Sequence, residues 1–131
     1  MIYLDTSVLL ATLLAQDHRP PRTLWRETLV SSRLLRYEVW NRLHARGLGH
    51  SHREAAESLL SRVALLELTP LVISRALDPF PRPIRTLDGL HLASCDHLRQ
   101  TGIDVTLSTY DRRMAETARA MGFALFEFPR R

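Results

Sequence analysis

Short apolar runs typical of buried strands alternate along this chain with segments that have helical spacing. Strand-like runs are expected at residues 2–4, 29–32, 65–68, 104–107 and 124–128. Helices are expected between them, at residues 7–15, 22–27, 35–47, 51–63, 71–77, 86–100 and 111–121. Strands that alternate with helices pack in layers around a mainly parallel sheet. The alternation therefore predicts an α/β fold of about four to five strands, with functional groups at the carboxyl ends of the strands.

Length and composition predict one domain over residues 1–131. Hydrophobic residues make up 45% of the chain and charged residues 24%, and no repeat or long linker interrupts the pattern. No apolar run approaches the ~20 residues that a membrane-spanning helix needs. The N-terminus lacks a positively charged leader, and the lone Cys95 cannot form an internal disulfide. We therefore expect a cytoplasmic protein that does not enter a membrane.

Arginine supplies all of the permanently positive side chains of this protein. The formal net charge is +4, and all 18 Lys and Arg residues are arginines. Arginine presents a planar, permanently charged fork that suits phosphate groups. The composition favours nucleic acid or an acidic partner, although arginines that are merely solvated would give the same totals.

Four acidic residues lie in apolar surroundings. Five others lie in polar or element-end settings and are expected at the surface: Glu27, Glu54, Glu57, Asp104 and Glu116. Asp5 directly follows the strand-like run 2–4, and Asp111 follows the run 104–107 and begins a helix. Asp88 lies in the first turn of its helix, where its i+3 neighbour is His91. Glu38 lies in a helix with an apolar face. These positions make the four acids candidates for a site.

Each of these acids also has a structural explanation. Asp111 could be a helix N-cap, and Asp88 could favour a helix N-terminus through the dipole. Glu38 could pair with Arg42, one turn further along its helix. Asp5 is the hardest to explain in this way, because nothing nearby in the sequence balances its charge and an unpaired buried carboxylate is very unfavourable.

If the four acids converge, their mutual repulsion requires protonation or a cation. At ~4 Å and an effective dielectric constant of ~20, each pair of like charges repels by about 4 kcal/mol. Carboxylate and hydroxyl oxygens are hard ligands that suit Mg²⁺ or Mn²⁺, and the chain has no Cys/His spacing typical of zinc. Such an ion can activate water and polarise a phosphodiester. The acids therefore suggest metal-dependent phosphoryl chemistry.

Four stretches taken together resemble a known family. They are YLDTSVLL (3–10), RYEVWNRL (36–43), TLDGLHLAS (86–94) and LSTYDRRMAETARAMG (107–122). In their order and spacing they are similar to PIN-domain ribonucleases, and more narrowly to the VapC-type toxins of toxin–antitoxin pairs. The resemblance implies a three-layer α/β/α sandwich and cleavage of RNA with Mg²⁺ or Mn²⁺. It also implies a homodimer that a cognate antitoxin inhibits.

The resemblance also implies roles for individual residues. The family's four acids correspond to Asp5, Glu38, Asp88 and Asp111, all of which are predicted to be catalytic and to form the metal site. Asp5 and Asp88 would be ligands, Asp111 would complete the set, and Glu38 would position or deprotonate the attacking water. The supporting hydroxyls would come from Ser7 or Thr6 beside the first acid, and from Thr109 or Ser108 beside the fourth.

Other residues support weaker expectations. Arg42, Arg112 and Arg113 could contact RNA phosphate or could be solvated. The aromatic residues beside the acids, which are Tyr37, Trp40 and Tyr110, are expected to pack rather than to stack on bases. His91 is expected to be a structural histidine bonded to a neighbour, and Cys95 is expected to be a core residue.

Three other functions fit parts of the sequence. A haloacid-dehalogenase-like phosphatase also begins with a strand and an aspartate, but it needs a second acid where this chain has Ser7, and it usually needs a lysine. A receiver-like signalling domain also needs a lysine, and the chain has none. A catalytically inactive PIN-like module that binds RNA or a protein partner is the remaining alternative, although such relatives usually lose some of the acids.

Overall fold

A five-stranded parallel sheet forms the centre of the molecule in a computed structural model that describes residues 1–129. The strands are β1 (Ile2–Leu4), β2 (Leu29–Ser32), β3 (Val63–Leu66), β4 (Thr106–Ser108) and β5 (Ala124–Leu125). Their order across the sheet is β3-β2-β1-β4-β5, and every neighbouring pair is parallel. The first strand, β1, therefore lies in the middle of the sheet. A parallel sheet whose strands alternate with helices along the chain confirms the predicted α/β class.

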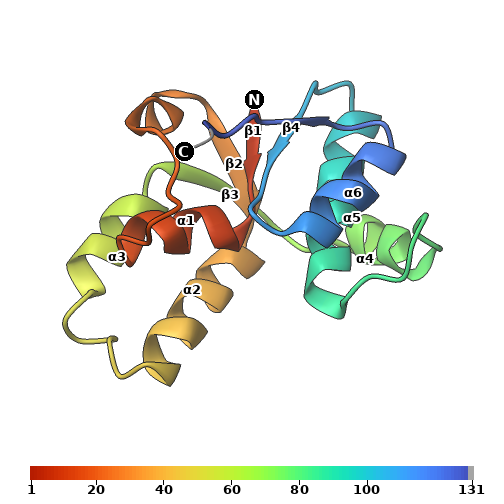
Figure 1. Cartoon of the computed structure of the whole chain (residues 1–131). Coiled ribbons are helices and arrows are strands. Elements are labelled where there is room, and N and C mark those ends of the chain that lie inside the picture. The colour runs from red at the N-terminus through yellow and green to blue at the C-terminus, as the bar shows by residue number, and fades with distance from the viewer. Residues whose placement is uncertain (130–131) are drawn as a thin grey trace.

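Helices cover both faces of this sheet and complete three layers (Figure 1). They are α1 (Thr6–Leu13), α2 (Leu34–Ala45), α3 (Arg53–Leu60), α4 (Pro70–Leu77), α5 (Thr86–Gln100) and α6 (Arg112–Ala120), with a short 3₁₀ helix η1 at Arg22–Arg26. The helices α1, α2 and α3 lie on one face, and α4, α5 and α6 lie on the other. The predicted α/β/α sandwich is confirmed.

The strands divide their side chains between two hydrophobic cores. Ile2 and Leu4 pack with α1, α2 and α3, whereas Tyr3 between them packs with α5 and α6. In β2, Leu29 belongs to the same core as Ile2 and Leu4, and Val30 belongs to the same core as Tyr3. Successive side chains of a strand point to opposite faces, so strands covered on both sides must be apolar throughout. This requirement explains the unbroken apolar runs in the sequence.

The register of the sheet brings the ends of β1 and β4 together. Leu4 pairs with Ser108, so Asp5 and Thr109 follow at the same edge. The Asp5 amide also donates a hydrogen bond to the Ser108 carbonyl at 3.0 Å, which extends the pairing by one residue. The two loops that leave these strands therefore begin side by side.

Two element boundaries near β3 differ from the prediction. The helix predicted to continue to residue 63 ends at Leu60, and β3 begins at Val63 rather than at residue 65. The pairing of Val63 with Leu29 sets this earlier start. The helix also begins later than predicted, at Arg53 rather than at residue 51, and the Ser51 hydroxyl lies 2.8 Å from Nδ1 of His52.

The end of the chain also differs from the prediction. A strand was predicted over residues 124–128, but β5 ends at Leu125. Phe126 and Phe128 instead pack against the core beneath α1, where Phe128 stacks on Tyr110 with ring centroids 4.2 Å apart. Burial of these two rings outweighs further strand pairing. No helix within the described residues is long and apolar enough to cross a membrane.

Candidate active site

Asp5 is the most buried of the four predicted acids. It has only 5% of its surface exposed and caps the N-terminus of α1. Its Oδ2 atom accepts hydrogen bonds from the Ser7 hydroxyl at 2.7 Å and from the Thr109 hydroxyl at 2.8 Å. Its Oδ1 atom accepts no hydrogen bond from residues 1–129. Among these residues Arg75 Nη1 is the one side-chain polar atom that is both buried and unpaired, so the unpaired Oδ1 atom of Asp5 is not buried. Oδ1 of Asp5 is therefore open to solvent and free to bind a cation.

The two hydroxyls beside Asp5 are themselves held by the backbone of the loop after β4. The Tyr110 amide donates to the Ser7 hydroxyl at 3.0 Å, and the Asp111 amide donates to the Thr109 hydroxyl at 3.0 Å. Each hydroxyl therefore accepts from this loop and donates to Asp5. This network sets the orientation of the carboxylate relative to the loop that carries Asp111.

The other two candidate hydroxyls lie elsewhere. Ser108 donates to the Tyr3 carbonyl within the sheet, so it does not reach Asp5. Thr6 donates to Oε1 of Glu38 at 3.0 Å. Of the alternatives left open by the sequence, the structure brings Ser7 and Thr109 to Asp5 and gives Thr6 to Glu38.

Glu38 is fixed by a buried histidine rather than by Arg42. Nε2 of His91 lies 2.5 Å from Oε1 of Glu38, and because a carboxylate only accepts, Nε2 donates. Nδ1 of the same ring lies 2.8 Å from the Tyr3 hydroxyl. His91 and Tyr3 are both fully buried. A chain of hydrogen bonds thus connects β1 through α5 to α2 and leaves Oε2 of Glu38 without a partner among the described residues.

Opposing effects act on the pKa of His91. Burial by itself lowers the pKa of the imidazole, but the hydrogen bond to Glu38 and the negative charges of Asp5, Glu38 and Asp88 outweigh it. The pKa is therefore raised, and the positive form of the ring is favoured beside Glu38. The expectation of a buried structural histidine bonded to a neighbour is confirmed, and the neighbour is one of the four acids.

Asp88 and Asp111 share a single arginine. Nε of Arg85 lies 3.3 Å from Oδ2 of Asp88, and Nη2 of the same guanidinium lies 2.9 Å from Oδ2 of Asp111. Asp111 also caps α6, because its Oδ1 accepts from the Met114 amide at 3.1 Å. Asp88 lies in the first turn of α5 and keeps its Oδ1 atom unpaired within residues 1–129. One cation therefore already bridges two of the acids.

The electrostatics of Asp88 show that the acids act on one another. Burial raises the pKa of the Asp88 carboxyl, and the negative charges of Asp5 and Asp111 raise the pKa further. Arg85 opposes this rise without cancelling it. A carboxylate that two like charges destabilise is one that a cation stabilises. The repulsion expected from the sequence is therefore present at this edge of the sheet.

The donor set fits a hard divalent cation, although the acids do not form a finished metal cage. Within the described part of the chain, no three His, Cys, Asp or Glu side chains are arranged to hold a metal ion as they lie. Oxygen atoms of Asp5, Glu38 and Asp88 are nevertheless unpaired, and oxygen ligands suit Mg²⁺ and Mn²⁺. The guanidinium of Arg85 holds Asp88 and Asp111 in the arrangement seen here.

A further buried acid, Asp96 on α5, has a structural role that its sequence setting did not indicate. Asp96 is buried, with 6% of its surface exposed. It accepts hydrogen bonds from Arg75 at 2.6 Å and from Arg99 at 2.9 Å, which lower the pKa of its carboxyl against the effect of burial. Asp96 is thus neutralised by its own chain, unlike Asp5.

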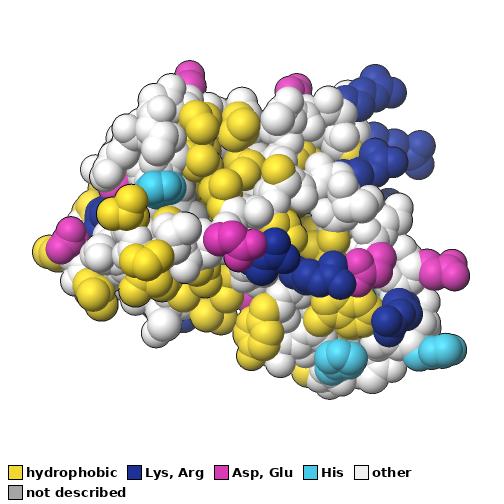
Figure 2. Space-filling view, turned by 180° about the vertical axis from the view of Figure 1, so that it is seen from behind, with side chains coloured by type: hydrophobic (Ala, Val, Ile, Leu, Met, Phe, Trp, Pro, Cys, Tyr) yellow, Lys and Arg dark blue, Asp and Glu magenta, His cyan; other side chains and the backbone are white. Residues whose placement is uncertain are grey.

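The remaining predicted residues lie mostly at the surface. Arg42 and Arg112 are exposed and form no ion pair with residues 1–129. Trp40 packs against the core beneath α1, as expected, but Tyr37 is 60% exposed and does not pack. On the face seen in Figure 2, arginines gather at one edge, whereas acidic and basic side chains lie together across the middle. Cys95 is buried in the core, as expected.

Two residues of this site carried little signal in the sequence. Arg85 lies in a proline-rich loop, and nothing local indicates that it contacts two acids. His91 lies at i+3 from Asp88 on a buried stripe, which suggests burial but not its partners Tyr3 and Glu38. Only the packing of α5 against β1 and α2 reveals those contacts.

Comparison with known proteins identifies similar sequences. The family model described as PIN domain matches residues 2–120. The chain is 35% identical over 130 residues to ribonuclease VapC46 of Mycobacterium tuberculosis, with 95% of each chain covered. It is 32% identical over 131 residues to ribonuclease VapC47 of the same species, with 94% of this chain and 93% of the relative covered.

Solved structures share the fold. VapC20 of Mycobacterium tuberculosis, described as a toxin that cleaves the sarcin-ricin loop, superposes with a TM-score of 0.71 at 24% identity. VapBC2 of Rickettsia felis, solved with a DNA fragment from its promoter, gives a TM-score of 0.71 at 15% identity. Each comparison covers 98% of this chain and 100% of the other. At these identities the similarity establishes the fold.

Proposed function

This chain belongs to the PIN-domain family, and we propose that it is a Mg²⁺- or Mn²⁺-dependent endoribonuclease of the VapC type. The observation that supports the proposal is that contacts and charge effects link four acids that come from four segments of the chain. Asp5 follows β1, Glu38 lies on α2, Asp88 on α5, and Asp111 precedes α6. Hydrogen bonds and mutual charge effects connect them.

We propose that Asp5, Asp88 and Asp111 would hold the ion and that Glu38 would complete the site beside the attacking water. When bound, a divalent ion polarises the phosphodiester and lowers the pKa of a water molecule. Ser7 and Thr109 hold Oδ2 of Asp5, so Oδ1 is the atom that would be available to the ion. Arg85 would have to release Asp88 and Asp111 for these two carboxylates to hold the ion.

Glu38 has the geometry of a base that accepts a proton from water. Its Oε1 atom is held by Thr6 and His91, and this contact fixes the side chain. Its Oε2 atom is free to accept a proton, and a positioned carboxylate of this kind accelerates hydrolysis by about 10²–10⁴-fold. The attacking water would lose a proton to Oε2 as its oxygen bonds to phosphorus, while the bond from phosphorus to the leaving ribose oxygen breaks and that oxygen takes up a proton from solvent.

The proposed activity is tested by incubating the purified protein with single-stranded RNA. We expect cleavage with Mg²⁺ or Mn²⁺ and none with EDTA, with products that end within the RNA rather than nucleotides released from its ends. Gel analysis of an end-labelled RNA distinguishes the two patterns. Cleavage that continues at the same rate in EDTA would contradict a metal-dependent mechanism.

One observation favours the alternative of an inactive PIN module. Arg85 neutralises Asp88 and Asp111 from within the chain, as a bound cation would. If this contact were permanent, the acids would stabilise the fold and bind no metal. The side chain of Arg85 is, however, 72% exposed, and exposed ion pairs contribute only about 0–1 kcal/mol. A divalent ion can therefore displace it.

The Arg85→Gln substitution separates these two functions. It removes the charge that competes for Asp88 and Asp111, so we expect Mn²⁺ to bind about fivefold more tightly, which corresponds to ~1 kcal/mol. Electron paramagnetic resonance measures free Mn²⁺ directly. Arg33→Gln is the control, because Arg33 pairs with Glu67 and with none of the four acids. Equal affinity in the Arg85→Gln variant and the wild type would contradict the competition.

We further propose that a cognate antitoxin inhibits this protein in the cytoplasm and that two copies form a dimer. The VapC relatives and the VapBC2 neighbour support a toxin–antitoxin pair. Leu71 and Leu77 on α4, which are 69% and 81% exposed, support a contact with another chain on this side of the molecule. Arg42 and Arg112 remain candidates for contacts with RNA phosphate.

A further inference from the structure

A groove leads away from the acids between the loop before α5 and the start of α6. A cavity of about 230 Å³ is lined by Asp88 and Arg85 together with Ile84, Pro83 and Arg113. A second cavity of about 380 Å³ shares Pro83 and Arg113 and continues along α6 to Thr117. Because they share two lining residues, the cavities form one continuous groove that begins at a predicted catalytic acid.

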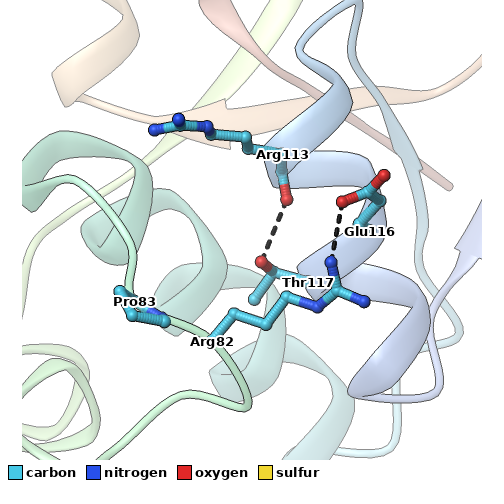
Figure 3. Close-up of a pocket in the computed structure, with 5 residues that line it drawn as sticks. All are labelled: Arg82, Pro83, Arg113, Glu116 and Thr117. Carbon is cyan, nitrogen blue, oxygen red and sulfur yellow. Dashed lines mark hydrogen bonds and ion pairs between the residues drawn. The ribbon is translucent and has the colours of Figure 1, made fainter.

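The arginines of this groove differ in how their charges are used. Arg82 reaches from the loop to α6, where it donates to Glu116 at 2.8 Å (Figure 3). Arg85 donates to Asp88 and Asp111. These two cations are therefore already compensated.

Arg113 is the cation of the groove that no acid of the described chain compensates. Figure 3 shows its side chain extending from the start of α6 away from the pair of Arg82 and Glu116. Its backbone carbonyl accepts from the Thr117 hydroxyl at 2.9 Å, but its guanidinium forms no hydrogen bond or ion pair with residues 1–129. A free guanidinium on the wall of a groove can bind a phosphate through two parallel hydrogen bonds.

We propose that this groove binds the RNA strand next to the cleaved bond and that Arg113 binds a phosphate of that strand. The inference rests on the proposed ribonuclease function, because only then does a phosphodiester lie at Asp88. Phosphate contacts fix the register of a strand without reading its sequence. Arg113 would therefore position the RNA relative to the acids and would be neutral to base identity.

The test measures RNA binding separately from cleavage. In protein that carries Asp5→Asn, binding of a fluorescent single-stranded oligoribonucleotide of mixed sequence is followed by anisotropy over a range of salt concentrations. Adding Arg113→Gln should weaken binding about tenfold at low salt. It should also reduce the slope of log K against log salt by about 0.7, because one fewer counterion-releasing contact is made. Adding Arg113→Lys, which keeps the charge, should preserve the slope.

The matched control is Arg62→Gln, which removes the same charge from an exposed residue before β3, at the opposite edge of the sheet. It should change affinity and slope much less than Arg113→Gln. Equal effects of the two substitutions, or loss of the slope with Arg113→Lys, would overturn the proposal. An Arg113→Gln substitution that leaves RNA binding unchanged but weakens binding of the antitoxin would also overturn the proposal. RNA that binds through Arg113 but is not cleaved by the wild type would contradict the proposed function alone.

Discussion

Asp5→Asn is expected to reduce metal-dependent RNA cleavage by at least about 100-fold. Loss of groups that only orient a metal ligand reduces activity by about 10–100-fold, and we propose that Asp5 is itself a ligand. Asparagine keeps the size of the side chain and one oxygen for Ser7 and Thr109, so the fold should persist. Initial rates at saturating Mn²⁺, together with a thermal unfolding curve, provide the measurement.

Asp104→Asn is the control for this substitution. Asp104 is exposed before β4 and lies in none of the contacts described for the site. The same chemical change there should leave cleavage within about twofold of the wild type, since surface substitutions perturb a protein only slightly. Equal activity of the Asp5→Asn protein and the wild type would remove Asp5 from the site.

His91→Ala is expected to lower the free energy of unfolding by about 3 kcal/mol. The substitution leaves a cavity and removes the hydrogen bond between the buried Tyr3 hydroxyl and the imidazole, and the loss of a buried hydrogen-bond partner costs about 1–3 kcal/mol. It also releases Glu38, so kcat should fall about 10–100-fold while KM for RNA changes little. Urea unfolding and steady-state kinetics measure the two effects.

Two variants separate the positioning role of His91 from general destabilisation. Tyr3→Phe removes the hydroxyl but leaves Glu38 bonded to His91, so it should lower stability by about 1 kcal/mol and leave kcat near that of the wild type. His97→Ala, on the same helix but only partly buried, should have little effect on either quantity. A kcat for His91→Ala equal to that of Tyr3→Phe would contradict the positioning of Glu38 by His91.

The sequence predicted the strands β1 and β2 and the helix α5 with their bounds, because each has a strong pattern. An apolar run between turn residues defines a buried strand, and Thr101 and Gly102 mark the end of a long helix at Gln100. The edges of the sheet were predicted less well. β3 and β5 are edge strands, and their extent depends on pairing and on where Phe126 and Phe128 find apolar contacts, which local patterns do not record.

The four acids were predicted from the sequence because each is polar within an apolar setting. Their partners were not, because they depend on tertiary packing. Arg85 reaches Asp111 across 26 residues, and His91 reaches Glu38 across 53. The alternative pair of Glu38 and Arg42 had the right spacing on one helix, but the buried histidine is the partner that Glu38 has in the structure.

Titration with Mn²⁺ of the wild type and of four variants tests the central claim most directly. The claim is that Asp5, Glu38, Asp88 and Asp111 form one divalent-cation site. Electron paramagnetic resonance should detect a tight Mn²⁺ site in the wild type that Asp5→Asn, Glu38→Gln, Asp88→Asn and Asp111→Asn each weaken. Mn²⁺ affinity that none of the four substitutions changes would contradict the account.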